Sequence, residues 1–229
     1  MKRGKRRGIF GVIALAAVLA ALIAAATAFA VAETIVASDN VFSKPVYTMD
    51  QGDRPLLQNT GVNQHNATAS ANGPDGRPLF ESPTIGTGTA QLDGTQFLTT
   101  GTYTFICTIH PSTMIATLAV SANGTPQPRP SLALKVLSKN LDKVARKGKL
   151  PVRVQATSAS QGVELEARLG KRRLGEVTGI NLAAGARRTV RVKLTKAGKK
   201  RLGKKNKAKV TVEGTVPFGS PATAKRKLK

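Results

Sequence analysis

The sequence predicts an all-β protein made of two β-sandwich domains in series. Beyond Ala32, apolar and polar residues alternate over short runs, and no long stretch repeats with the 3.6-residue period of a helix. Clusters of Gly, Pro, Asn and Asp separate these runs, as in Asn72–Gly76. Short strands separated by such turns are typical of antiparallel sandwiches and barrels.

The distribution of charge supports a division into two domains. Residues 33–130 carry four basic and seven acidic side chains, whereas residues 131–229 carry 27 basic and five acidic ones. Almost all of the net charge of +24 therefore belongs to the second half of the chain. A mildly acidic part followed by a strongly basic part indicates two units with different partners.

The N-terminus has the composition of an export signal. Residues 1–8 are strongly basic, and residues 9–32 form an unbroken apolar run that ends in the small-residue pattern Ala28-Phe29-Ala30. We favour a cleaved signal peptide over residues 1–32; a retained N-terminal membrane anchor is the alternative, because 24 apolar residues are enough to span a bilayer. In both cases we expect residues 33–229 outside the cytoplasm, as a secreted or periplasmic, cell-wall associated or outward-facing anchored protein.

Four strands are expected in the first domain, residues 33–122, from short alternating runs. They cover Thr34–Ala37, Gln91–Thr99, Thr102–Ile106 and Ile115–Val120. A Pro-rich linker is expected over residues 123–131, because Pro126, Pro128 and Pro130 stand at alternate positions and favour a stiff, extended chain.

The second domain, residues 132–229, repeats the strand pattern with a basic composition. Val190, Val192 and Leu194 alternate with Arg191 and Lys193, which gives one apolar and one cationic face. This half resembles an immunoglobulin-like sandwich of about seven strands, with short helical turns near residues 139–149 and 195–205. Its expected strands are Leu132–Leu137, Val152–Ala156, Val163–Leu169, Thr189–Leu194, Lys209–Val216 and Thr223–Leu228.

The residue types that bind soft metals are rare and lie in one pattern. Cys107 is the only cysteine, and His65 and His110 are the only histidines. Cys107 follows the expected strand Thr102–Ile106, and His110 and Met114 lie on the short loop after it. Two imidazoles, one thiolate and a thioether suit an electron-transfer copper site. A zinc site with four Cys and His ligands is excluded, since the chain has only three such residues.

The motif Gly-x-Tyr-x-Phe-x-Cys-x-x-His over residues 101–110, with Met114 after it and the pair His65-Asn66 before it, resembles the plastocyanin/azurin-like blue copper proteins, the cupredoxins. The resemblance covers about residues 34–121. It implies a Greek-key sandwich and one type 1 copper held by His65, Cys107, His110 and Met114. It also implies that Asn66 bonds to Thr108 and so joins the two ligand loops.

The resemblance implies a non-catalytic, monomeric protein that carries single electrons between redox partner proteins. We expect no enzymatic activity, and a multicopper oxidase is excluded, because its further copper ions need many more histidines than two. Copper storage or delivery outside the cytoplasm is the alternative function. A structural surface protein that has lost its metal is a third, against which the intact ligand set argues.

The basic second domain predicts an anionic partner. An anionic cell-wall polymer or membrane surface bound through residues 132–229 is our hypothesis, and a merely solvated cationic surface is the alternative. Nucleic acid is not expected, because Phe218 is the only aromatic residue beyond residue 130 and bases therefore have no stacking platform.

Overall fold

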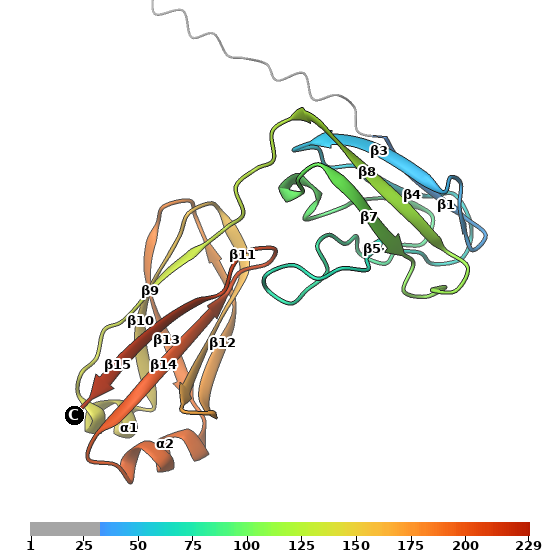
Figure 1. Ribbon diagram of the computed structural model, residues 1–229. Helices are drawn as coiled ribbons and strands as arrows, with labels where there is room; N and C mark the ends of the chain where they lie inside the picture. The colour runs from blue at the N-terminus through green and yellow to red at the C-terminus, as the bar shows by residue number, and fades with distance from the viewer. Residues whose placement is uncertain (1–32) are drawn as a thin grey trace, which may run out of the picture.

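The computed structural model describes residues 33–229 and contains two β-rich bodies in series (Figure 1). The predicted all-β class is confirmed, with a second β-sandwich after the first. The predicted signal peptide or anchor, residues 1–32, lies outside the described residues. Within residues 33–229, no helix has the length and apolar character needed to cross a membrane.

The first body consists of two four-stranded sheets. One has the strand order β2-β1-β4-β6 and the other the order β3-β8-β7-β5. A single 3₁₀ turn, η1 (Thr95–Phe97), precedes β7. The strands are β1 (Ile35–Ser38), β2 (Val41–Phe42), β3 (Val46–Gln51), β4 (Leu56–Asn59), β5 (Thr68–Ala69), β6 (Gly88–Gln91), β7 (Gly101–Ile106) and β8 (Ile115–Gly124).

Alternation along these strands fills one core between the two sheets. Tyr47 from β3, Leu57 from β4 and Leu118 from β8 are completely buried, while their neighbours along each strand are more exposed. The rings of Phe80 and Phe105 meet in the same core, with centroids 6.1 Å apart. This core contains Cys107 and Met114, so the side chains of the metal motif are part of the packing of the sandwich.

Two features differ from the sequence-based expectation. The first sandwich is not purely antiparallel, because β1 pairs with β4 and β3 pairs with β8 in parallel. The expected strand Gln91–Thr99 is wrong: β6 ends at Gln91 and the chain turns through η1. The turn forms because Gly94 adopts a left-handed φ of 99° and the buried hydroxyl of Thr95 bonds to the carbonyls of Asp53 and Leu92.

The second body is a seven-stranded antiparallel sheet folded over its own core. The strand order is β15-β14-β11-β12-β13-β10-β9, and β12 and β13 pair at only two positions, so the sheet bends there into two facing halves. A separate hydrophobic core lies between these halves. The strands are β9 (Leu132–Val136), β10 (Lys149–Ala156), β11 (Ser160–Leu169), β12 (Arg172–Leu182), β13 (Arg187–Leu194), β14 (Ala208–Thr215) and β15 (Ala222–Leu228).

The two expected helical turns are short helices, α1 (Leu141–Lys147) and α2 (Lys196–Gly203). Asn140 caps α1 by accepting a hydrogen bond from the Lys143 amide at 2.7 Å, and Thr195 caps α2 in the same way at the Gly198 amide. The two helices lie side by side at the end of the second body that is farthest from the first (Figure 1).

The two bodies meet around Phe218, in the loop between β14 and β15. The Phe218 amide donates to Asp75 of the first body at 2.8 Å, and its carbonyl accepts from Arg129 at 2.9 Å. The Phe218 ring lies near that of Phe97, with centroids 6.4 Å apart. Burial lowers the pKa of Arg129, although nearby Asp75 opposes that shift.

Candidate metal centre

The β7–β8 hairpin places Cys107 and Met114 opposite each other. The last paired residues of the ladder are Ile106 and Ile115, and beyond them the Cys107 amide still donates to the Met114 carbonyl at 3.1 Å. Both side chains are completely buried. Inside the loop, the amides of His110 and Met114 donate to Cys107 O and His110 O, at 3.2 and 2.9 Å. These bonds fix a tight turn that carries His110 back over Cys107.

His65 reaches the same point from the loop between β4 and β5. Its backbone forms an isolated bridge with Ile85, in which each amide donates to the other carbonyl at 2.9 Å. The side chain is completely buried. Because both backbone groups of His65 are paired with Ile85, the loop fixes the main-chain position from which the ring reaches Cys107.

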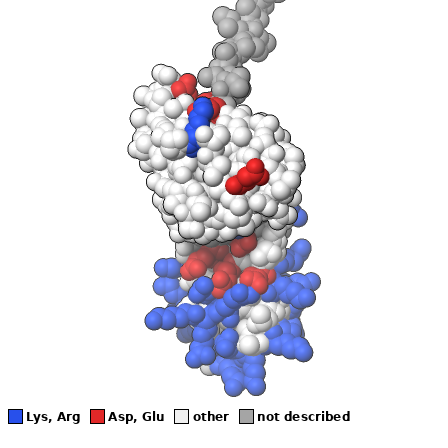
Figure 2. All heavy atoms as spheres, turned by 90° about the vertical axis from the view of Figure 1, so that its right-hand side faces the viewer, with Lys and Arg blue, Asp and Glu red and all other residues white. Residues whose placement is uncertain are grey.

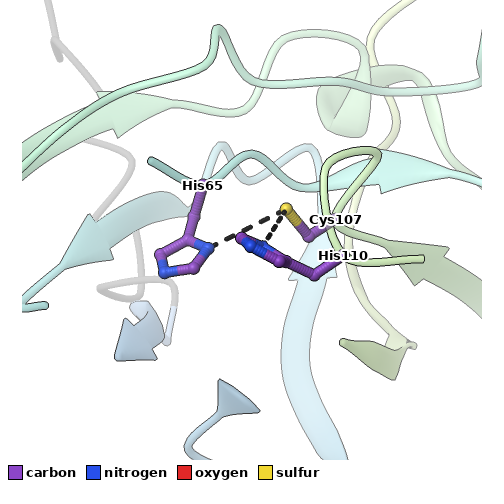
Figure 3. Close-up of side chains that lie close together, drawn as sticks. All are labelled: His65, Cys107 and His110. Atoms are coloured by element: carbon purple, nitrogen blue, oxygen red, sulfur yellow. Dashed lines mark hydrogen bonds between the residues drawn. The ribbon is translucent and has the colours of Figure 1, made fainter. Parts of the chain in front are cut away.

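The structure brings His65, Cys107 and His110 together as a three-residue cluster (Figure 3). The Cys107 sulfur lies 3.9 Å from Nδ1 of His65 and 3.8 Å from Nδ1 of His110. The three ligand atoms all lie within 4.8 Å of one another. Bonds of about 2.0 Å to nitrogen and 2.3 Å to sulfur at trigonal angles give a nitrogen–sulfur distance of about 3.7 Å, so the residues fit one central metal ion.

The surroundings of His65 also fit a metal ligand. Burial, and next the neighbouring His110, lower the pKa of His65, whereas Asp39 acts weakly in the opposite direction. The ring is therefore neutral at neutral pH and has a lone pair to offer on Nδ1. The buried Nε2 has no hydrogen-bond partner among the described residues. With the proton on this Nε2, Nδ1 on the side of Cys107 is the nitrogen that can bind a metal.

Asn66 joins the two loops that carry the ligands. Its Oδ1 accepts from the Thr108 amide at 2.8 Å, and its Nδ2 donates to the Thr108 hydroxyl at 2.7 Å. Nδ2 also donates to the Thr84 hydroxyl at 3.1 Å. Thr84 and Ile85 are positioning residues that the sequence did not reveal, because they lie in a turn-rich stretch with no metal-binding residue type.

Several apolar side chains near His110 are exposed to solvent. Ile109 is 45% exposed and Ile115 is 54% exposed, and Val62 on the His65 loop is 86% exposed. His110 itself is half-buried, whereas His65 and Cys107 are completely enclosed. His110 is thus the member of the cluster that lies between the buried sulfur and the surface.

No protein-family model and no curated protein matches this sequence. Among solved structures, the chain is similar to amicyanin, a cupredoxin. A reduced amicyanin mutant is 22% identical, with 40% of this chain and 84% of that chain covered and a TM-score of 0.34. A mutant in the reduced Cu(I) form at pH 4 is 24% identical, with 38% and 82% covered and a TM-score of 0.32.

These similarities cover 40% of the chain or less. The assignment of the metal centre therefore rests on the residues themselves. Two imidazole nitrogens and one thiol converge, and a buried thioether residue lies at the end of the same loop. Such a donor set suits copper.

Proposed function

We propose that the chain is an exported mononuclear blue copper protein that carries single electrons between redox partner proteins. The main observation behind this proposal is that His65, Cys107 and His110 converge in a mostly buried cluster. Met114 is the proposed fourth, axial ligand, supported by its burial and by the backbone bond between Met114 and Cys107.

The donor set favours copper over zinc. Structural zinc is held by four Cys, His or carboxylate ligands, and catalytic zinc keeps an open position for water. The cluster has only three such ligands among the described residues, and His65 and Cys107 have no solvent exposure. Two histidines, one thiolate and a weak thioether instead match the trigonal sites used for electron transfer.

The residues around the cluster suit electron transfer without catalysis. Copper held there supplies a one-electron couple. Asn66 fixes the distance between the His65 loop and Thr108, so the ligands need not move when the charge of the site changes. His65 and Cys107 exclude water and substrate from the centre, and the half-buried His110 offers the shortest covalent path to the apolar surface formed by Ile109 and Ile115.

The wider organisation is part of the same proposal. Residues 33–122 form the copper domain, residues 123–131 the linker and residues 132–229 the basic domain; the two separate hydrophobic cores support this division. Location outside the cytoplasm rests on the basic and apolar composition of residues 1–32. The redox partner docks at the apolar surface near His110, and the protein acts as a monomer.

The test is to add copper to residues 33–229 and to record the absorption and electron paramagnetic resonance spectra. We expect an intense blue colour from charge transfer between the thiolate and Cu(II), and its complete loss in Cys107→Ser. A zinc-loaded sample is the matched control and stays colourless. Colour that persists in Cys107→Ser contradicts the proposal.

Delivery of copper is the competing function. Metal transfer and electron exchange, both measured on the same copper-loaded protein, distinguish the two functions. A carrier holds its copper in the presence of an apo acceptor, because its ligands are enclosed. It also exchanges electrons quickly with a redox partner. Rapid transfer of the metal itself to the acceptor, with slow electron exchange, assigns the protein to delivery instead.

A further inference from the structure

The basic side chains of the second domain line a groove. One depression lies between the β11–β12 turn, the C-terminal end of α2 and the start of β14, and a second lies between β14 and the end of β15. The two share Lys207, Ala208 and Lys209, so they form one continuous feature, which we call the basic groove. Its lining contains nine Lys or Arg residues and no Asp or Glu.

The positive charge of the basic groove is not neutralised by the protein itself. Four of the five acidic residues of this domain already form ion pairs, all with Arg77, Arg168 or Arg173, none of which lines the groove. The fifth, Asp142, lies in the first turn of α1. In Figure 2 the acidic atoms of the lower body gather near the junction, and basic atoms cover the surface below them.

Like charges also face each other within the groove. Lys209 of β14 pairs directly with Lys227 of β15, and both side chains are exposed. Directly opposed residues of antiparallel strands have Cβ atoms about 5 Å apart, and two side chains of like charge at opposed positions destabilise the pair. A bound anion placed between the two ammonium groups removes this repulsion.

We propose that the basic groove binds a linear, water-soluble phosphate polymer. A membrane surface is disfavoured, because every large apolar side chain that is well exposed among the described residues belongs to the first domain, so the second offers nothing to insert into a bilayer. Binding through nucleic-acid bases is disfavoured too, because Phe218, the only aromatic residue of the domain, lies at its other end against Phe97.

The groove and the metal centre lie far apart in the molecule. Strand β8 starts next to the metal centre at Ile115 and ends at Gly124, at the start of the linker, and its ten residues span about 30 Å. The groove lies beyond the linker, at the end of the second domain that carries α2 (Figure 1). A polymer in the groove therefore leaves His110 open to a redox partner, and the inference does not depend on copper binding.

The test uses residues 33–229, which contain both hydrophobic cores, and fluorescently labelled long-chain inorganic polyphosphate. Binding is followed by anisotropy between about 50 and 200 mM salt, because phosphate contacts release counterions and weaken as salt rises. The groove variant neutralises four exposed side chains: Lys205→Gln, Lys207→Gln, Lys209→Gln and Lys227→Gln. The control variant removes the same charge from β10 and β13: Arg153→Gln, Arg187→Gln, Arg191→Gln and Lys193→Gln.

We expect the groove variant to bind polyphosphate at least about tenfold more weakly, with a salt slope lower by about 3, and the control variant to stay within about threefold of the wild type. Circular dichroism confirms that both variants are folded. Equal losses in the two variants overturn the proposal in favour of diffuse cationic charge. Phosphatidylglycerol vesicles or oligothymidine bound more tightly than polyphosphate also overturn it, and assign the groove to a membrane or to nucleic acid.

Discussion

Asn66 is the residue that makes one site out of two loops. His65 comes from the connection between β4 and β5, whereas Cys107 and His110 belong to the β7–β8 hairpin. The side-chain amide of Asn66 is saturated by Thr108 and Thr84, so one residue sets the separation of the two ligand-bearing loops. Such an outer contact governs the orientation of the ligands without touching the metal.

Asn66→Ala is therefore expected to lower the free energy of unfolding of the apo protein by about 2 kcal/mol, because the part-buried hydrogen bonds between Asn66 and Thr108 are lost. Copper affinity falls by about tenfold or more, as is typical when an outer-shell partner is removed. Chemical denaturation and a copper titration measure the two effects. Asn63→Ala, an exposed change in the same loop, should alter neither; an equal effect there rules out the positioning role.

Met114 tests the identity of the axial ligand. Met114→Leu should keep the blue colour and raise the reduction potential by about 59 mV or more, because losing a weak donor disfavours the more highly charged Cu(II) state. Cyclic voltammetry gives the potential. Met49→Leu makes the same substitution in the same core and should leave the potential unchanged. An unchanged potential in Met114→Leu points to a different axial group.

At the scale of elements, α2 depends on a close approach to β12. The carbonyl of Leu174 accepts from the Thr195 amide at 2.9 Å, and a Cβ on Gly198 would lie 2.2 Å from that same oxygen. Only glycine allows the first turn of this helix to dock there. The position of the helix in turn determines where Arg201 lies. This residue lines the basic groove and donates to the Arg173 carbonyl.

Gly198→Ala should consequently destabilise the protein by about 2 kcal/mol, because the helix has to move away from a backbone atom. Gly203→Ala lies in the same helix, where the new methyl group meets open space, and should stabilise it by up to about 1 kcal/mol. Thermal denaturation of the two variants gives the comparison. A destabilisation of the same size in both would show that helix propensity, not docking, decides the effect.

The elements differ in how far the sequence reveals them. The metal motif could be found because Cys and His are so rare here, and β7 and β8 because their alternation is regular. Strand β12 was not expected, since Gly175 and Gly179 interrupt its pattern and its pairing with β11 contains register shifts. The parallel pairing of β1 with β4 could not be predicted from the sequence either. It depends on how the chain crosses between the two sheets rather than on local residue order.

At the scale of the whole molecule, the two domains are connected by direct contacts, which we call the joint, as well as by the linker. The amide of Gln127 in the linker donates to the Gln96 carbonyl at 2.8 Å, and the guanidinium of Arg129 lies 5.7 Å from the centre of the Phe97 ring. Phe218 completes the joint with a left-handed φ of 61°, which is unfavourable for an aromatic residue. Strain of this kind persists only where surrounding contacts hold it in place.

Phe218→Ala should release the joint, because its ring packs against Phe97 and closely approaches Gly94 across the boundary. ¹⁵N relaxation then changes from one common rotational correlation time to two shorter ones, one for each domain. Ser220→Ala, an exposed change in the same loop, should keep the common value. The copper spectrum should be the same in all three proteins, since His110 lies at the opposite end of β8 from the linker. A single correlation time that persists in Phe218→Ala would show that the linker bonds hold the domains together without this ring.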